Sequence, residues 1–340
     1  MNDISTQNWT PPVFEIDGCD TLPKLFRQNC RKFGSAIAIR ERDFGIWEEY
    51  TWTDYYHRSR QAGCALMALG VDAGDVVAII SEDNKEWVFS DLGIQCIGAV
   101  THGLYPTLQE KQVAYQLNDS GAKVVFVEDE EQLDKYLLVQ DELPGIEKVV
   151  VYDMEGLRRF SHDKVMGWEA FLELAADGAP EMHAAFETRI DAGKGEDIAT
   201  LIYTSGTTGA PKGAMISHRF FLAQADNHPE MPLGPGDEIL TFLPLCHAAE
   251  RIISVATPIR HGITINIAES GETFNADIQE VAPTFIFAVP RVWEKFYSRI
   301  SFIMNDATAF GRFAYTQALK VAERRADLLA AGKQVPLGQQ

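Results

Sequence analysis

The sequence predicts an α/β protein built on doubly wound, mostly parallel sheets covered by helices. Short apolar runs alternate with amphipathic segments along most of the 340 residues. The apolar runs, such as residues 76–80, are bounded by charged residues and are too short for buried helices, so they indicate strands. Strands that alternate with helices need crossover connections, which in a parallel sheet are right-handed and cover both faces.

The alternation places the elements of the first half in order. It predicts strands at 36–40, 75–80, 123–127 and 149–152, and helices at 22–33, 53–69, 85–97, 110–118 and 131–142. Thr53 is a candidate N-cap of the second helix, and Gly70 a candidate stop. Between about 153 and 195 the pattern weakens and acidic residues accumulate, which indicates either a subdomain boundary or a surface excursion.

The alternation then resumes in the second half. It predicts strands at 198–203, 238–243, 263–267 and 284–289, and helices at 219–227 and 247–260, the latter ending near Gly262. From 291 onward the chain is predicted to be mostly helical, with one long helix over 307–331.

Composition excludes several classes of protein. The chain has 30 basic and 49 acidic side chains and a net charge of -19, which argues against a general nucleic-acid binder. Five scattered cysteines without a CxxC pair argue against a disulfide framework or a zinc site, and favour a cytoplasmic location. The sequence contains neither a transmembrane run nor a secretory signal, and it leaves open whether the protein contacts a membrane surface. It does not indicate an oligomeric state.

Residues 200–214 (TLIYTSGTTGAPKGA) carry the strongest functional signal. The core of this segment follows a predicted strand and combines four hydroxyls with two glycines: Thr204, Ser205, Gly206, Thr207, Thr208 and Gly209. Glycines let the backbone approach a ligand closely, and successive N–H groups in such a turn form an anion-binding concavity. Lys212 adds a positive charge that can meet a phosphate. The segment therefore predicts a triphosphate-binding loop.

Other glycine-rich motifs do not fit this segment. A P-loop requires Gly-Lys-Ser/Thr, whereas Lys212 follows Pro211 and precedes Gly213. The dinucleotide pattern G-x-G-x-x-G is also absent from it. A flexible linker would need neither the apolar strand before the loop nor the Pro-Lys-Gly after it.

The stretch from Tyr203 to Gly213 resembles the signature of the adenylate-forming superfamily, which includes acyl-CoA synthetases, luciferases and peptide-synthetase adenylation domains. The resemblance implies that a carboxylate attacks the α-phosphate of ATP, that pyrophosphate leaves, and that the acyl group passes to a thiol. It also implies that Thr204 is a Mg²⁺ ligand and that the loop holds the ATP phosphates through Tyr203, Thr204, Ser205, Gly206, Thr207, Thr208, Gly209, Lys212 and Gly213.

A second segment, residues 242–251 (FLPLCHAAER), is similar to the LPLxHxxER run of long-chain acyl-CoA synthetases. The resemblance implies that His247 lies close to the acyl and adenylate site. From the residues alone, His247 could equally cap or pack the start of a helix, and Glu250 and Arg251 are expected to form a structural ion pair. Residues 289–297 also resemble this group. Four aromatic residues are candidates for lining an acyl tunnel, although ordinary core packing explains them as well: Phe220, Phe221, Phe285 and Phe287.

The resemblance runs from about residue 22 to the end of the chain. It implies a long-chain fatty acid–CoA ligase that uses fatty acid, ATP, Mg²⁺ and CoA. Alternatives are a fatty acyl-AMP ligase or another carboxylate-activating relative, a non-catalytic protein that binds nucleotide or a partner, and an unrelated nucleotide-binding regulator.

The family continues with a Y-G-x-T-E segment, a ribose-binding Asp, a hinge and a C-terminal domain that carries a lysine, and these motifs do not occur in the 340 residues. We therefore expect residues 1–340 to be an incomplete, N-terminal part of the large adenylating domain. We expect this part alone to bind phosphate weakly and not to turn over substrate.

Overall fold

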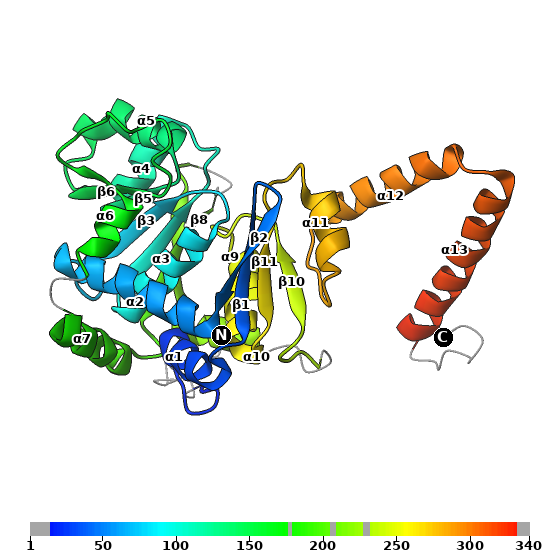
Figure 1. The fold of residues 1–340 in the computed structure, drawn as a ribbon, viewed down its shortest axis with the longest axis horizontal. Coiled ribbons are helices and arrows are strands. Elements are labelled where there is room, and N and C mark those ends of the chain that lie inside the picture. Colours follow the sequence, from blue (N-terminus) through cyan, green and yellow to red (C-terminus); the bar gives the residue numbers. More distant parts are fainter. Residues whose placement is uncertain (1–13, 176–178, 205–208, 227–231, 332–340) are drawn as a thin grey trace, which may run out of the picture. The chain divides into compact units, whose positions relative to one another are not determined.

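The computed structural model describes residues 14–175, 179–204, 209–226 and 232–331. The chain divides into two compact units, Met1–Ile286 and Phe287–Gln340. The first unit contains two β-sheets with helices around them, and the second contains helices (Figure 1).

A seven-stranded sheet has the order β7-β6-β5-β3-β4-β8-β9. All its neighbouring strands pair in parallel except β8 and β9, which form an antiparallel pair. The strands are β3 (Val76–Ile80), β4 (Val100–Leu104), β5 (Ala122–Val127), β6 (Lys148–Val151), β7 (Val165–Gly167), β8 (Ile198–Thr204) and β9 (Lys212–Ser217).

A four-stranded sheet has the order β10-β11-β1-β2, with β10, β11 and β1 parallel and β2 antiparallel to β1. The strands are β1 (Ile37–Asp43), β2 (Ile46–Thr51), β10 (Glu238–Thr241) and β11 (Thr264–Ile267). The two sheets together confirm the predicted α/β class with mostly parallel sheets.

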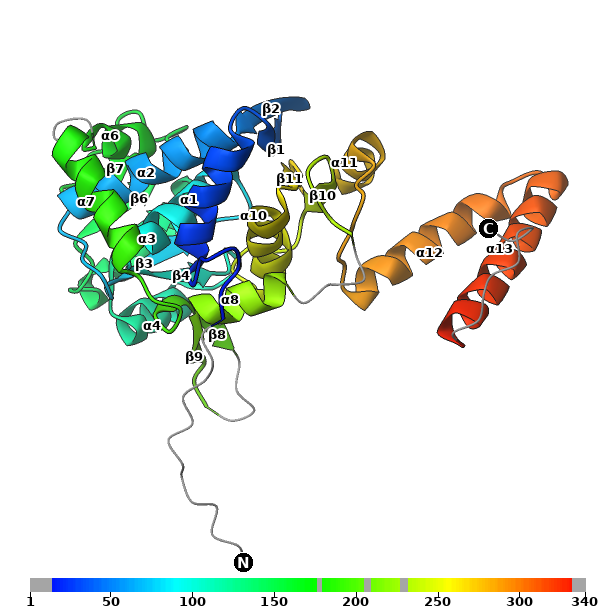
Figure 2. The same ribbon diagram turned by 90° about the horizontal axis from the view of Figure 1, so that it is seen from below.

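Helices cover the seven-stranded sheet on both faces. Alternate residues of one strand enter different cores: Val77 and Ile79 pack in the larger core, whereas Ala78 and Ile80 pack in the smaller one. The larger core includes side chains of α2 (Trp52–Ala68), α3 (Lys85–Cys96), α6 (Trp168–Glu173) and α7 (Ala179–Ala192). The smaller core includes side chains of α4 (Glu110–Ser120) and α5 (Glu130–Val139). In Figure 2, α2 and α3 lie on one side of this sheet and α4 on the other.

The first unit contains further helices and helical turns. They are α1 (Leu22–Phe33), the 3₁₀ turn η1 (Gln140–Glu142), α8 (His218–Ala225), α9 (Ala248–Arg251), the π-helical turn η2 (Ile252–Ala256), α10 (Thr257–His261) and α11 (Phe274–Val281).

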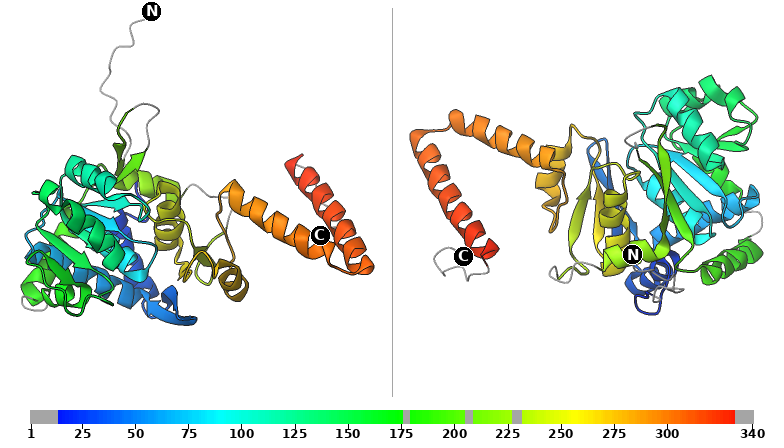
Figure 3. Two further views of the ribbon diagram at one scale, coloured as in Figure 1. Left: turned by 90° about the horizontal axis from the view of Figure 1, so that it is seen from above. Right: turned by 180° about the vertical axis from the view of Figure 1, so that it is seen from behind.

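The second unit contains α12 (Pro290–Asn305) and α13 (Ala309–Ala330), joined by a short turn (Figure 3). Their long apolar side chains are largely exposed, as Tyr297 at 64% and Phe302 at 70% illustrate. In the part of the chain that the structure describes, no helix is both long and apolar enough to span a bilayer.

Most predicted elements agree with the structure to within a few residues, and the first helix is confirmed at 22–33. The predicted cap of α2 is wrong: the N-cap is Thr51, whose hydroxyl accepts from the Asp54 backbone N–H in a capping box. The predicted strand at 284–289 is also wrong, because Phe285 forms only an isolated bridge with Ile239 and its neighbours form no strand. Residues 153–195 contain β7, α6 and α7, and β7 is an edge strand of the seven-stranded sheet.

Candidate functional site

The predicted phosphate loop connects the two strands of the β8–β9 hairpin. The strand register pairs Thr204 with Lys212 and Tyr203 with Gly213, so the residues on either side of the loop lie opposite one another. Both Thr204 and Lys212 are exposed. Gly209 has a φ of +102°, a backbone conformation that residues with a side chain rarely adopt. The predicted residues Ser205, Gly206, Thr207 and Thr208 lie outside the described part of the chain.

Helix α4 holds both strands of this hairpin. The Tyr203 hydroxyl donates to the Asp119 carboxylate over 2.6 Å, and the Tyr115 hydroxyl donates to the Pro211 carbonyl oxygen over 2.9 Å. Burial, together with the hydrogen bond to Asp119, raises the pKa of Tyr203, so the phenol stays protonated and keeps donating. A Cβ at Gly213 would approach the Tyr203 ring to 3.1 Å, which explains a glycine at this position.

His102 of β4 packs against the ring of the same tyrosine. Its ring lies 4.6 Å from the Tyr203 ring, and its nitrogens lie within hydrogen-bonding distance of Ser120 Oγ and Gln116 Oε1, at 3.1 and 3.3 Å. Burial lowers the pKa of His102 to about 4, so the imidazole is neutral near pH 7. His102 carries no signal in the sequence, because β4 (VTHGL) contains no strong apolar run.

His247 occupies the N-cap of α9. It is exposed, and its Nδ1 accepts a hydrogen bond from the Ala249 backbone N–H over 3.2 Å. The structure thus gives His247 a helix-capping role, and its role beside an acyl or adenylate group stays a prediction.

The predicted ion pair between Glu250 and Arg251 is wrong. Arg251 forms its ion pair with Asp91, and both side chains are buried. Glu250 accepts a hydrogen bond from Ser254 Oγ over 2.7 Å, and backbone N–H groups of Phe242 and Leu243 also stabilise its charge. Burial nevertheless raises the pKa of Glu250 to about 7. Adjacent side chains on a helix point in different directions, so neighbours in sequence cannot be assumed to pair.

The segment that precedes His247 is fixed to the end of β3. The Leu245 backbone N–H donates to Asp83 Oδ1 over 2.8 Å. Burial raises the pKa of Asp83 well above its usual value. A Cβ at Gly103 of β4 would lie 3.0 Å from both Cα and Cβ of Cys246. These close contacts place the His247 segment directly beside β3 and β4 of the seven-stranded sheet.

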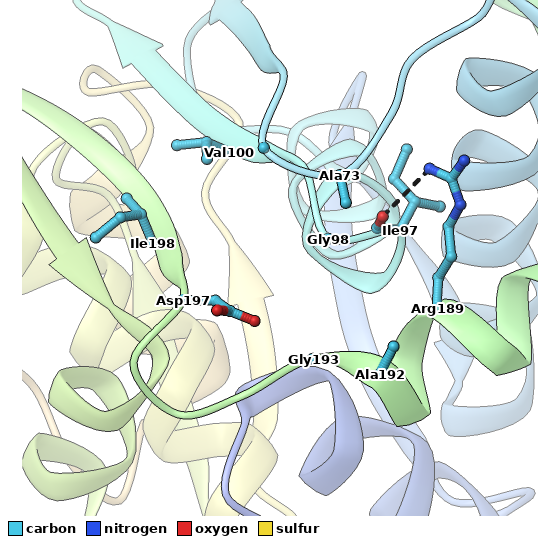
Figure 4. A pocket seen from close by; sticks show the side chains of 10 residues that line it. Ala73, Ile97, Gly98, Val100, Arg189, Ala192, Gly193, Asp197 and Ile198 are labelled. Carbon is cyan, nitrogen blue, oxygen red and sulfur yellow. Dashed lines mark hydrogen bonds between the residues drawn. The ribbon is translucent and has the colours of Figure 1, made fainter.

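A cavity of about 360 Å³ lies at the other end of the strands (Figure 4). Its lining includes residues that precede or begin β3, β4 and β8: Gly74, Gly98 and Ile198. The Arg189 guanidinium, which reaches in from α7, already donates to two carbonyl oxygens and to the Asp72 carboxylate over 2.7 Å. The cavity is therefore separate from the hairpin loop, which follows the carboxyl end of β8.

The four candidate tunnel residues have different environments. Phe221 is buried in the larger core and Phe285 packs against it, whereas Phe220 is 37% exposed. Phe287 belongs to the second unit. Phe221 and Phe285 therefore pack in the core, which is the alternative to lining an acyl tunnel.

Comparison with known proteins is consistent with this arrangement. The model of a family described as AMP-binding enzyme matches residues 26–335. The long-chain-fatty-acid–CoA ligase ACSBG2 of Rattus norvegicus is 31% identical over 289 residues, covering 82% of this chain and 43% of that protein. The long-chain-fatty-acid–CoA ligase ACSBG1 of Homo sapiens is 31% identical over 291 residues, covering 82% of this chain and 39% of that protein. The chain thus spans less than half the length of these curated relatives.

Solved structures share the fold. The anthranilate CoA ligase AuaEII in complex with anthranoyl-AMP superposes with a TM-score of 0.68 at 22% identity, over 82% of this chain and 50% of that one. The N-terminal domain of FACL13 from Mycobacterium tuberculosis superposes with a TM-score of 0.66 at 22% identity, over 80% of this chain and 63% of that one. The family match over residues 26–335 shows that the chain belongs to the family of AMP-binding enzymes.

Proposed function

We propose that this chain supplies the phosphate-binding part of an enzyme that activates a long-chain fatty acid with ATP and transfers the acyl group to CoA. The observation that carries the proposal is the β8–β9 hairpin, in which Thr204 and Lys212 face one another across the strands that flank a glycine- and hydroxyl-rich loop. A hydroxyl, a flexible ammonium group and backbone N–H groups at one strand end are what a polyphosphate requires.

The reaction depends on charge neutralisation and alignment more than on covalent help from the protein. Lys212 would meet the charge of the β- and γ-phosphates, while the α4 contacts to Tyr203 and Pro211 hold the hairpin in place. Flanking residues held in this way reduce the reorganisation needed when pyrophosphate leaves.

Magnesium fits this site as a companion of the nucleotide. No group of three or more His, Cys, Asp or Glu side chains in the described residues could hold a metal ion by itself. The exposed Thr204 hydroxyl offers one oxygen, and Mg²⁺ commonly takes its other ligands from phosphates and water. Bound there, Mg²⁺ would neutralise phosphate charge.

The acyl substrate class rests on the two curated relatives described above, both of which are named long-chain-fatty-acid–CoA ligases. His247 is proposed to lie beside the acyl-adenylate, because it is exposed at the start of α9 and follows the strand end at β10. Ligands of open α/β sheets bind outside the carboxyl ends of the strands.

Calorimetric titration of the 340-residue chain with MgATP and with inorganic tripolyphosphate tests the phosphate site. We expect weak binding of both, and a roughly tenfold weaker affinity in Lys212→Ala, because one charge-assisted contact is lost. Lys320→Ala, which removes an exposed lysine from α13, is the matched control and should bind as the unsubstituted chain does. Absence of binding, or equal binding in Lys212→Ala, would overturn the assignment of the loop.

The reaction itself is tested on a polypeptide that includes the remaining length of the relatives. ATP–pyrophosphate exchange that depends on a long-chain fatty acid, together with formation of an acyl-CoA thioester, supports the proposal. Exchange without a thioester would favour the fatty acyl-AMP ligase. Nucleotide binding without exchange would favour the non-catalytic alternative.

A further inference from the structure

A closed ring of buried polar groups lies between the phosphate hairpin and the helix that carries His247. Arg251 donates to the Asp91 carboxylate and to the Thr200 hydroxyl. The Thr200 hydroxyl donates to the Thr101 carbonyl oxygen, and the Thr101 hydroxyl donates to Asp91 Oδ1, each over 2.7 Å. The ring joins α9, α3, β8 and β4, which are distant in the sequence.

The Arg251 guanidinium makes cation–π contacts with two aromatic rings. Its central carbon lies 5.1 Å from the centre of the Trp87 ring and 5.6 Å from that of the Phe221 ring. Trp87 belongs to α3, and Phe221 belongs to α8, which directly follows β9. A guanidinium gains from aromatic faces when it is desolvated. Arg251 therefore contacts β8 before the loop, at Thr200, and the helix that follows β9, at Phe221.

The same residue is fixed to the His247 segment. The Arg251 backbone N–H donates to the His247 carbonyl oxygen over 3.1 Å, so the two residues lie one helical turn apart. The π-helical turn η2 begins at the next residue, and such turns are frequent at functional sites. Arg251 thus connects the strand that leads into the loop with the exposed imidazole.

Stability alone is a weak reason for this ion pair. Asp91 and Arg251 are 0% and 1% exposed, and the cost of removing two charges from water often exceeds their attraction. Asp91 Oδ2 has no hydrogen-bond partner among the described residues. An apolar pair of similar size is often equally stable or more stable. What an apolar pair cannot supply is the set of directed hydrogen bonds that fixes Thr200 and α9 in one arrangement.

We propose that Arg251, held by Asp91, is a positioning residue that fixes the phosphate hairpin relative to His247. This inference rests on the proposed function, because it assumes that the loop binds phosphate. The pair acts through Thr200, four residues before Thr204, and touches neither nucleotide nor acyl group.

The test replaces the pair by apolar residues of similar size, Asp91→Leu with Arg251→Met. We expect this double variant to fold, at most with a lower unfolding temperature, because the Gln95 amide and the Thr101 hydroxyl lose their acceptor. We expect it to bind tripolyphosphate at least about tenfold more weakly in calorimetry. Hydrogen exchange of the backbone amides of β8 and β9 should become faster. A double variant that folds stably and binds tripolyphosphate as the unsubstituted chain does would overturn the inference.

A matched control uses a second ion pair with one fully buried partner. Arg42 of β1 binds Asp277 of α11 over 2.6 Å, away from the hairpin strands. Arg42→Met with Asp277→Leu should leave the tripolyphosphate affinity unchanged; an equal loss in this control would assign the effect to general destabilisation and overturn the inference.

If the double variant Asp91→Leu with Arg251→Met does not fold, a third variant, Thr200→Val, tests the inference. Thr200→Val keeps the shape of the side chain and the ion pair but removes the hydroxyl of the ring. We expect several-fold weaker tripolyphosphate binding, and unchanged affinity in a folded Thr200→Val would overturn the inference. If the unsubstituted chain itself fails to bind tripolyphosphate, the proposed function fails first, which separates the two outcomes.

Discussion

The Tyr203 hydroxyl donates to the Asp119 carboxylate over 2.6 Å, and this bond joins the end of β8 to the last turn of α4. Asp119 is exposed, so the bond orients the hairpin more than it stabilises the fold. Together with the bond from Tyr115 to Pro211, it fixes both sides of the phosphate loop to one helix. Helix α4 therefore holds the residues that flank the phosphate loop on both sides.

Tyr203→Phe should weaken phosphate binding more than it weakens the fold. It removes one hydrogen bond to a charged but exposed partner, so we expect a loss of about 1 kcal/mol in the free energy of unfolding. Tripolyphosphate affinity should fall roughly fivefold, because the hairpin loses its orientation. Denaturant unfolding and calorimetry measure the two effects, and Tyr297→Phe on the exposed face of α12 is the control. An unchanged affinity would show that α4 does not set the loop.

Glu250→Gln should change how stability depends on pH. Burial raises the pKa of Glu250 to about 7, whereas the unfolded side chain titrates near 4.3. The folded protein keeps a proton that the unfolded chain loses, so this residue makes the free energy of unfolding fall as pH rises from about 4.5 to about 7. Glutamine cannot ionise but can still accept from Ser254.

The stability of Glu250→Gln relative to the unsubstituted chain should therefore increase between pH 5 and pH 8, by up to roughly 3 kcal/mol. Denaturant unfolding at several pH values measures this difference. Glu294→Gln, which removes an exposed carboxylate of α12, is the matched control. A flat difference for Glu250→Gln would contradict the raised pKa.

His102→Gln should change the pH dependence of stability in the opposite direction, below about pH 6.5. Burial lowers the pKa of His102 to about 4, below the value of about 6.5 in an unfolded chain. Unfolding therefore takes up a proton in this window, and the histidine makes stability fall as pH drops from 6.5 to 4. The variant lacks the ring contact with Tyr203 at all pH values. Because glutamine does not titrate, the variant also lacks the loss of stability that protonation of His102 causes at low pH.

The stability deficit of His102→Gln should accordingly be larger at pH 7 than at pH 4.5, as unfolding curves at both pH values would show. His183→Gln provides the comparison, because the His183 side chain is only partly buried, whereas His102 is fully buried. A deficit of equal size at both pH values would indicate that His102 is not held neutral.

Most of the parallel strands could be predicted because their local sequence decides them, but β4 (VTHGL) and β7 (VMG) were missed. Runs such as 76–80 are buried on both faces, and burial on both faces requires continuous apolar side chains. Strand β9 (KGAMIS) was missed because it is a largely exposed edge strand, which forms through its antiparallel pairing with β8. The cap of α2 was misplaced although Thr51 and Asp54 carry the capping-box pattern in the sequence.

The candidate site could be predicted only in part, for the same physical reason. The loop residues are local in sequence, and a short motif is enough to indicate their chemistry. The partner of Arg251 is 160 positions away, and Asp91 lies within an unbroken buried helix that gives no local signal of an ion pair. A neighbouring acid, Glu250, was therefore assigned to Arg251, although the fold brings Asp91 to it instead.

Gly103→Ala should disturb the His247 segment without touching the phosphate loop. An added Cβ would lie 3.0 Å from the Cα and Cβ of Cys246 and 3.3 Å from Trp87 Cζ2, and the backbone of Cys246 cannot move aside as a flexible side-chain end could. Overpacking of this kind costs about 1–3 kcal/mol. We expect that loss in denaturant unfolding, together with faster hydrogen exchange at the backbone amides of residues 245–249.

The tripolyphosphate affinity of Gly103→Ala should change less than that of Tyr203→Phe, because the α4 contacts to the hairpin stay intact. Gly145→Ala is the matched control: its Cβ would come no closer than 3.9 Å to the Ala122 carbonyl oxygen, and restricting the unfolded chain should stabilise the fold slightly. Equal stability in Gly103→Ala and Gly145→Ala would mean that the His247 segment is not packed against β4. In that case the close approach of β4 to Cys246 could not be what places His247 beside the seven-stranded sheet.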